Sequence, residues 1–402
     1  MERVDSVAKA SPDTEVPAER RYREPASFSL TAQGQALGFY PSGQDRLRAL
    51  LKLIDSAQVT LRIAFYIFSP DASGILVRDA IVAAARRGVD VSVIVDGFGA
   101  SVDAEFFAGL EEAGGCFCCF MPRWSARYLI RNHQKIVVAD GKIAMLGGFN
   151  VEDSYFAPPE EDGWTDLAFT IEGSLVERVA AWFDQLEDWA RQPRPRFRDI
   201  RHRVREWDAG EAPVQLLIGG PTRGLSSWAR CVGRDLIQGE RLDMMMAYFT
   251  PSSRLLKRIR QIAAAGRTRL VMAGKSDNNA TIGASRALYK KLLKAGAQIW
   301  EFQPNKLHTK LIVLDDAVYM GSANFDMRSL YLNLEIVVRI EDRALAETMS
   351  DFIAQHLPAS LAITPQLHRQ RATLWNRLRW RISWFLVSVV DYTVSRKLNL
   401  GL

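Results

Sequence analysis

The feature that most constrains how this 402-residue chain can fold is an internal repeat. An apolar run, VTLRIAFYIFSP, has a counterpart later in the chain, RLDMMMAYFTP, and each precedes an amphipathic segment that ends at a glycine, Gly88 or Gly266. A second apolar run and a second amphipathic segment, ending at Gly114 or Gly296, follow in both places. This repeated order of strand and helix signals indicates a duplicated unit, in which the glycines are expected to end the helices in a left-handed conformation.

The repeat also predicts the fold class and the domain organisation. Shorter β-branched runs follow each crossover unit, so we expect an α/β fold of two similar halves, each a mixed sheet flanked by helices, packed around one shared site. Composition and turn-forming residues set the expected boundaries. These are a flexible leader over 1–35, a first half over 36–195, a Pro- and Arg-rich linker over 196–213, a second half over 214–360, and a basic, Trp-rich helical segment over 361–402.

Each half contains one copy of a histidine motif with the spacing H-x-K-x4-D. The string NHQKIVVADGKIAMLGGFN and the string LHTKLIVLDDAVYMGSANFD carry it, and both continue to a glycine and then an asparagine three residues later. The motif residues are His133, Lys135, Asp140 and Asn150 in the first half and His308, Lys310, Asp315 and Asn324 in the second. Residues two apart in a β-strand point to the same face, so each histidine and its lysine are expected to reach one cleft.

A single motif of this kind is usually a surface pair, whereas two copies with matching spacing predict one composite site. Two imidazoles offer a nucleophile and a proton donor, and the ammonium and amide groups suit phosphoryl oxygens. The predicted chemistry therefore needs no metal ion and no other cofactor. The second hairpin is one residue shorter between its aspartate and its glycine, which leaves the alignment of Asn324 with Asn150 open.

The paired motifs resemble the phospholipase D superfamily over the chain from Phe39 to about Pro358. Within that superfamily the strings AFYIFSPD, AARRGVDVSVIVDG, HQKIVVADGKIAMLGGFN and NFDMRSLYLNLE are similar to bacterial cardiolipin synthases, particularly a shorter class without N-terminal membrane helices. The resemblance implies a phosphatidyltransferase that makes cardiolipin from phosphatidylglycerol, or from a related phospholipid donor, through a phosphohistidine intermediate.

The resemblance also implies a role for each motif residue. His133 is expected to be the nucleophile and His308 the acid that protonates the departing glycerol, with the reverse assignment open. Asp166 and Glu335, at corresponding places beyond the two asparagines, are expected to orient the histidines. The lysines and asparagines would surround the transferring phosphoryl group, while the motif aspartates, Asp140 and Asp315, would hold the hairpins or brace a lysine.

Three alternative functions stay open at this point. A phospholipase D hydrolase releasing phosphatidate would use the same core motifs, with water as the acceptor. A nuclease of the same superfamily would fit the basic isoelectric point, but such nucleases are commonly single-motif chains that dimerise. A lipid-binding scaffold with a decayed site would have lost a motif histidine or lysine, and none is missing.

Charge and hydropathy favour a membrane surface as the partner. The net charge of +6 attracts polyanions without choosing between lipid and nucleic acid. The first twenty residues contain no apolar signal-peptide core, and the longest apolar run, Ile382–Val390, is about half of a membrane span. Together with the resemblance, these features predict a peripheral protein on the cytoplasmic face of a bacterial inner membrane. It would act on anionic phospholipids, with no nucleic acid and no obligate protein partner.

The C-terminal segment RATLWNRLRWRISWFLVSVVDYTVSRKL mixes arginines with tryptophans and branched apolar residues, and it resembles an interfacial helix. Trp375, Trp380 and Trp384 would then lie at headgroup depth, next to arginines that bind anionic phosphates. The alternative is a helix docked on the protein's own core.

Overall fold

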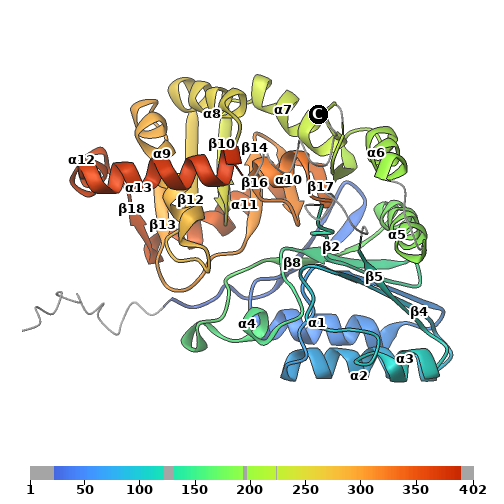
Figure 1. The fold of residues 1–402 in the computed structure, drawn as a ribbon. Coiled ribbons are helices and arrows are strands. Elements are labelled where there is room, and N and C mark those ends of the chain that lie inside the picture. The colour runs from blue at the N-terminus through green and yellow to red at the C-terminus, as the bar shows by residue number, and fades with distance from the viewer. Residues whose placement is uncertain (1–21, 122–129, 193–196, 223, 391–402) are drawn as a thin grey trace, which may run out of the picture.

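The computed structural model of the protein describes residues 22–121, 130–192, 197–222 and 224–390. Two eight-stranded mixed sheets, each flanked by helices, confirm the predicted α/β fold (Figure 1). The first half contains β1 (Phe28–Ala32), β2 (Gln35–Tyr40), α1 (Gly43–Ser56), β3 (Thr60–Phe65), α2 (Ala72–Arg86), β4 (Asp90–Asp96), α3 (Ala108–Glu112), β5 (Cys116–Phe120), β6 (Ile136–Ala139), β7 (Ile143–Gly147), α4 (Asp153–Phe156), β8 (Ala168–Glu172) and α5 (Leu175–Arg191).

The second half begins after the helix α6 (Phe197–Glu206). It contains β9 (Val214–Gly219), α7 (Ser227–Gln238), β10 (Arg241–Met246), β11 (Phe249–Thr250), α8 (Ser253–Ala265), β12 (Arg267–Ala273), α9 (Asn279–Lys294), β13 (Gln298–Phe302), β14 (Lys310–Leu314), β15 (Ala317–Gly321), β16 (Phe325–Asp326), α10 (Met327–Tyr331), β17 (Glu335–Glu341), α11 (Arg343–Gln355) and β18 (Ser360–Ala362). The chain then forms α12 (Pro365–Arg371), α13 (Leu374–Phe385) and a π-helical turn, Leu386–Val390.

The strand order shows the duplication directly. Seven strands of the first sheet run β2-β8-β7-β6-β3-β4-β5, and seven of the second run β9-β17-β15-β14-β10-β12-β13. In both sheets the three strands from the crossover unit pair in parallel, and the motif hairpin, β6–β7 or β14–β15, pairs antiparallel beside them. The two motif hairpins therefore occupy the same place in their sheets.

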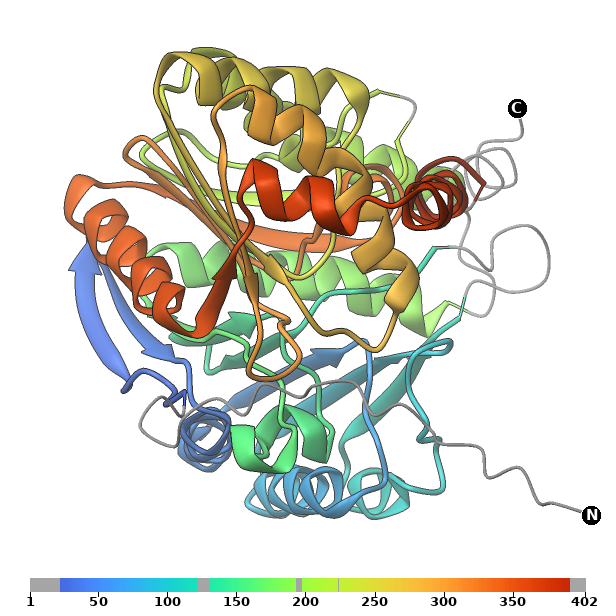
Figure 2. The same cartoon turned by 90° about the vertical axis from the view of Figure 1, so that its left-hand side faces the viewer.

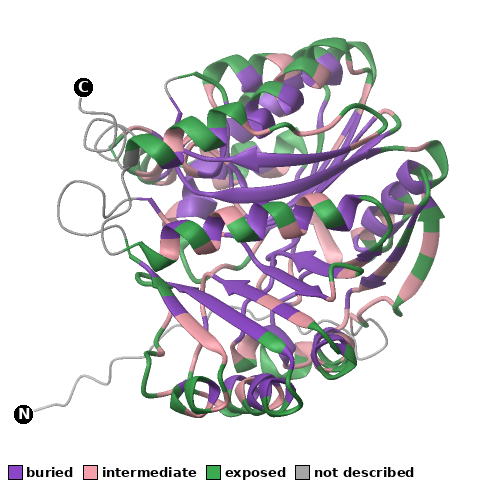
Figure 3. Cartoon of the chain, turned by 90° about the vertical axis from the view of Figure 1, so that its right-hand side faces the viewer, coloured by how far each residue is buried: buried purple, intermediate pink, exposed green. Residues whose placement is uncertain are grey.

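The two sheets face each other across a shared apolar core. Inward-facing residues of both sheets pack with one side of α5 and one side of α11, which lie between the sheets (Figure 2). Helices α1 and α2 cover the outer face of the first sheet, and α7, α8 and α9 cover that of the second. Figure 3 shows the buried residues concentrated in the sheets and on the inward faces of the helices. Because the halves share this core, they are held as one body around their junction.

The structure differs from the expected organisation in three places. The described fold starts before residue 36, because FSLTA alternates inward and outward side chains and pairs with the next strand through a tight turn at Gln33 and Gly34, both with positive φ. The linker contains helix α6, whose Ile200 and Val204, four residues apart, are both buried. The second sheet extends to Ala362. Residues 1–21 of the expected leader and residues 391–402 lie outside the described residues.

The glycine prediction was confirmed at three of its four positions. Gly88, Gly114 and Gly296 have φ values between 86° and 96°, the left-handed conformation expected after a helix. Gly266 does not adopt it, with φ −139° and ψ −136°. A glycine is needed there for another reason: a Cβ atom would lie 2.1 Å from the carbonyl oxygen of Glu240.

The C-terminal helix docks on the protein with one face and exposes the other. Helix α13 packs on α9, and Trp380 is buried there, stacked on His368, so the expectation that Trp380 lies among lipid headgroups was wrong. Trp375 is 71% exposed on the opposite face. Within the described ranges, none of the helices is both long and apolar enough to span a bilayer.

Candidate active site

A cavity of about 540 Å³ lies between the two halves and brings the two motifs together. His133 and His308 both line it, as do Asn150 and Asn324. The remaining lining includes three tyrosines, Tyr66, Tyr155 and Tyr248, and polar or charged residues from the start of α9 and from α10. The first residues of the π-helical turn, Leu386 and Val387, complete the wall. The predicted composite site is therefore a single cavity with two imidazoles.

Each motif histidine lies in an extended segment just before its strand, rather than on the strand as the motif spacing suggested. The backbone N–H of His133 donates to the carbonyl of Leu334 (3.0 Å), and that of His308 donates to the carbonyl of Thr165 (2.8 Å). Isolated parallel bridges, Asn132 with Leu334 and Thr165 with Leu307, continue this pairing. The main chain at each histidine is thus bonded to the opposite half, which fixes both imidazoles relative to the junction.

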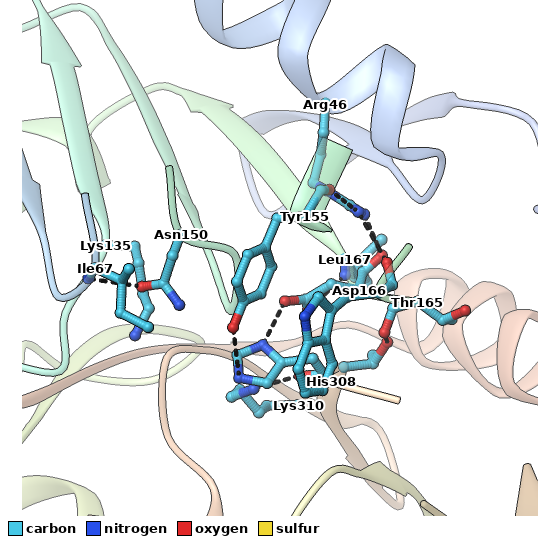
Figure 4. A network of polar contacts seen from close by, with 12 residues as sticks. Arg46, Ile67, Lys135, Asn150, Tyr155, Thr165, Asp166, Leu167, His308 and Lys310 are labelled. Atoms are coloured by element: carbon cyan, nitrogen blue, oxygen red, sulfur yellow. Dashed lines mark hydrogen bonds and ion pairs between the residues drawn. The ribbon is translucent and has the colours of Figure 1, made fainter. Parts of the chain in front are cut away.

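The two orienting carboxylates cross between the halves. Nδ1 of His308 lies 2.7 Å from Oδ2 of Asp166, which belongs to the first half (Figure 4). Nδ1 of His133 lies 3.0 Å from Oε2 of Glu335, which belongs to the second half. Both carboxylates are fully buried. When Nδ1 carries the ring proton and donates it to the carboxylate, the lone pair of Nε2 is free to react.

Burial and nearby ammonium groups keep both imidazoles neutral. Burial lowers the pKa of His308 to about 3, with the Lys310 charge adding to the effect and Asp166 opposing it. Burial, Lys135 and Lys310 together hold the pKa of His133 well below its usual value. A neutral imidazole is the form that attacks phosphorus, so the free protein already holds the nucleophilic form.

The motif lysines lie beneath the cavity floor, with their side chains almost completely buried. Nζ of Lys135 donates to the carbonyl of His133 (2.6 Å), and Nζ of Lys310 donates to the carbonyl of His308. Burial lowers the pKa of Lys135 to about 7 and that of Lys310 to about 8. An anionic phosphoryl group in the cavity would stabilise the protonated lysines, which in turn would neutralise its charge.

The two asparagines occupy equivalent positions, which settles the alignment left open by the shorter hairpin. The glycines three residues before them have φ of 159° at Gly147 and 154° at Gly321, so both strands turn into the cavity in the same way. Oδ1 of Asn150 accepts from the backbone N–H of Ile67 (3.1 Å). Oδ1 of Asn324 is buried and has no hydrogen-bond partner among the described residues.

The motif aspartates lie away from the cavity, at the turns of the two hairpins. Asp140 has φ 54°, and its carboxylate accepts from the backbone N–H groups of Val59 (2.7 Å) and Thr60 (2.9 Å) at the start of β3. Asp315 has φ 53° and accepts from the N–H of Arg241 (2.8 Å) at the start of β10. The structure therefore places both motif aspartates outside the cavity, and of their two expected supporting roles it shows the holding of the hairpins.

Several site residues were missed by the sequence reasoning. The hydroxyl of Tyr155 lies 3.5 Å from Nε2 of His308, and the buried guanidinium of Arg46 donates to the carbonyls of Asp166 and Tyr155 (Figure 4). Neither residue stands in a repeated motif, so no sequence pattern pointed to them. Tyr66 and Tyr248 could have been found from the sequence, because they follow corresponding strands of the repeat. The Tyr66 ring packs against His133, with centroids 5.0 Å apart.

The arrangement suits in-line displacement at a phosphodiester. Two neutral imidazoles, each held by a carboxylate, open on one cavity, and a buried lysine ammonium lies behind each of them, bonded to the carbonyl of that histidine. Such a site can form a covalent bond to phosphorus on one side and exchange a proton with the leaving oxygen on the other. Among the described residues, no three histidine, cysteine, aspartate or glutamate side chains are grouped so that they could hold a metal ion.

A family model described as cardiolipin synthase, phospholipase D-like domain, matches residues 50–187 and 235–357. The chain belongs to this cardiolipin synthase family. Cardiolipin synthase B of Escherichia coli K12 is 31% identical over 355 residues, which cover 86% of each chain. Cardiolipin synthase 1 of Bacillus cereus is 32% identical over 335 residues, which cover 77% of this chain but only 64% of that protein. Family membership places the chain among phospholipase D-type phosphatidyltransferases, for which phospholipids are the substrates.

Solved structures support the fold of this family member. The phosphatidylserine synthase of Haemophilus influenzae superposes with a TM-score of 0.70 at 16% identity, over 92% of this chain and 96% of that one. The polyphosphate kinase of Porphyromonas gingivalis superposes with a TM-score of 0.52 at 15% identity, over 80% of this chain and half of that one. At such identities the likeness concerns the architecture of two packed halves alone.

Proposed function

We propose that this chain makes cardiolipin by transferring a phosphatidyl group from phosphatidylglycerol, or a related donor, to the glycerol head of a second phosphatidylglycerol. The observation that carries the proposal is the pair of carboxylate-held imidazoles on one cavity. Nε2 of His133 attacks phosphorus, a P–N bond forms, and the P–O bond to the donor's glycerol breaks. His308 gives a proton to that departing oxygen.

His308 takes up its proton from water when the substrate binds. In the free protein the pKa of His308 is about 3, so this imidazole holds no transferable proton at neutral pH. A phosphodiester anion in the cavity raises the pKa of both imidazoles, since an opposite charge nearby favours the protonated ring. Asp166 then stabilises the imidazolium. In the second step His308 removes the proton from the acceptor hydroxyl, whose oxygen displaces His133 from phosphorus.

Docking on a membrane surface belongs to the same proposal. The outward face of α13 exposes a stripe of large apolar side chains, of which Leu374 is 85% exposed and Trp375 is 71% exposed. The stripe continues through Leu378 and Ile382 to Leu386, which lines the reaction cavity. Insertion of this stripe into the headgroup region would bring the cavity mouth to the lipid. We place the protein on the cytoplasmic face of a bacterial inner membrane.

Lipid product analysis tests the proposal. Purified protein is incubated with labelled phosphatidylglycerol in mixed vesicles, with and without a chelator, alongside His133→Ala and His308→Ala. Cardiolipin and glycerol that form in chelator and vanish in both variants are the expected result. Phosphatidate alone would replace the transferase with a hydrolase. Full turnover in either folded variant would refute the shared site.

A further inference from the structure

Helix α13 lies across α9 (Figure 1). Two further cavities flank α13 there. One, of about 460 Å³, lies between α9, α12 and α13, and the other, of about 630 Å³, lies between α8, α9 and α13. The helices come closest at Gly283, where a Cβ atom would meet Oγ of Ser383 at 2.7 Å. Neither cavity contains a residue of the reaction site described above.

Both cavities carry positive charge that the protein leaves uncompensated. Lys290, Lys294 and Arg381 line both of them, and Arg369 and Arg377 line the first. Within the part of the chain that the structure describes, neither lining includes an aspartate or glutamate, and these five cations form no ion pair. Like charges gathered around a hollow repel one another, so a bound anion is stabilised there.

The walls between these cations are apolar. Leu293, Ala372 and the buried ring of Trp380 line the first cavity, and Leu256, Leu288 and Phe385 line the second. Free phosphate or a nucleic-acid backbone would pair with the cations but leave the apolar walls exposed to water. A ligand that brings a phosphate and a hydrocarbon chain satisfies both features at once.

We propose that these two cavities form a second binding site for an anionic phospholipid, separate from the reaction cavity. Its phosphate lies against Lys290, Lys294 and Arg381, and its acyl chains follow the apolar walls on either side of α13. The site is coupled to the reaction cavity through the same two helices. Thr281, in the first turns of α9, lines the reaction cavity, and so do Leu386 and Val387, which continue α13. A lipid that binds to both α13 and α9 therefore restricts the motion of one wall of the reaction cavity.

Photocrosslinking of the full chain tests this site. The probe is a short-chain phosphatidylglycerol with a diazirine in one acyl chain, used below its micelle concentration, and the labelled peptides are identified by mass spectrometry. We expect adducts on α9, α12 and α13 in addition to those at the reaction cavity. In the triple variant Lys290→Gln, Lys294→Gln, Arg381→Gln the adducts at the three helices should fall by roughly tenfold or more, because each cation near an anionic headgroup contributes measurably.

A matched variant distinguishes the loss of a specific site from a general loss of positive charge. Lys52→Gln, Arg86→Gln, Lys142→Gln removes three exposed cations from the first half and should leave all labelling unchanged. Equal labelling by a phosphatidylcholine probe, displacement by millimolar inorganic phosphate alone, or unchanged labelling in the first triple variant would overturn the proposal. None of these results would alter histidine-dependent transfer with monodisperse substrate, so failure of this site and failure of the proposed function are distinguishable.

Discussion

Replacing the carboxylate of Asp166 by an amide tests the crossed pairing at the candidate site. Asp166 is fully buried, and its Oδ2 lies 2.7 Å from Nδ1 of His308. Asp166→Asn keeps the size of the side chain, but its single oxygen can accept from Nδ1–H of His308 or from the N–H of Leu167, which lies 2.8 Å from Oδ1 of the aspartate, and not from both. Since the side chain keeps its size, the fold should be retained while the negative charge beside the imidazole is lost.

The expected loss follows from the strength of that one contact. A hydrogen bond to a charged group contributes about 1.5–3 kcal/mol, and a neutral one about 0.5–1.5 kcal/mol. The difference of about 1–2 kcal/mol corresponds to a fall in kcat of at least roughly 5- to 30-fold if one proton transfer by His308 limits turnover, and the fall is larger where the amide turns its NH2 group to Nδ1 and forces the other tautomer. Asp166 raises the pKa of His308. Its removal should also shift the basic limb of the kcat profile to lower pH, since the imidazolium is then populated only in more acidic solution.

The assay is the initial rate of cardiolipin formation in mixed micelles between pH 6 and 9, with thermal melting as the check on folding. Asp188→Asn makes the same chemical change at an exposed position of α5 and serves as the control. A folded Asp166→Asn enzyme with the wild-type kcat and an unshifted profile would refute the role assigned to this carboxylate.

Three further predictions concern stability and packing. Asp140→Ala should lower the free energy of unfolding by about 1–2 kcal/mol in urea titrations, because it removes the cap of β3, and should leave kcat unchanged; a tenfold lower kcat would return this aspartate to the catalytic set. Burial lowers the pKa of His356 to about 4, below its value near 6.5 when unfolded. The neutral His356 ring therefore leaves the free energy of unfolding undiminished above about pH 6.5. As pH falls, the unfolded chain binds a proton at this position and the folded protein does not, so the free energy of unfolding drops by about 2 kcal/mol at pH 5. His356→Phe should shrink the difference in unfolding free energy between pH 7 and pH 5 by that amount, and an unchanged difference would contradict the assignment. Gly283→Leu should force α13 away from α9, since a Cβ atom at residue 283 would already meet Ser383. Trypsin should then cleave within α13 faster than in the wild type, and Gly283→Ala should have a milder effect. Equal cleavage of the wild type and both variants would argue against the contact.

Local patterns in the sequence predicted most of the fold and the two motifs that meet at the cavity. Duplicated strand and helix signals lead to two sheets with the same strand order, and both motif histidines and asparagines line the same cavity. The hairpin at residue 28 and helix α6 were missed because short or strongly charged segments have weak apolar periodicity. Their apolar positions become visible once a core exists for Ile200 and Val204 to pack against.

The crossing of the carboxylates could not be read from spacing. Asp166 and Glu335 were recognised as orienting residues, but which histidine each one contacts depends on how the halves pack. The same is true of Tyr155 and Arg46, which reach His308 and Asp166 through tertiary contacts alone. The expectation for Trp380 failed for a related reason, because a tryptophan pattern does not say which face of a helix docks on the protein.

The crossed pairing makes each half depend on the other for a working histidine, so the halves are not two independent copies of one site. His133 depends on Glu335 and His308 depends on Asp166, so neither half carries a complete histidine–carboxylate pair. A small rotation of one half against the other disturbs both imidazoles together. Fusion of the halves into one chain fixes their stoichiometry and allows the two histidines to have different carboxylate partners, a glutamate for His133 and an aspartate for His308. One histidine can therefore become the better nucleophile and the other the better acid, a division of labour that two identical halves could not sustain.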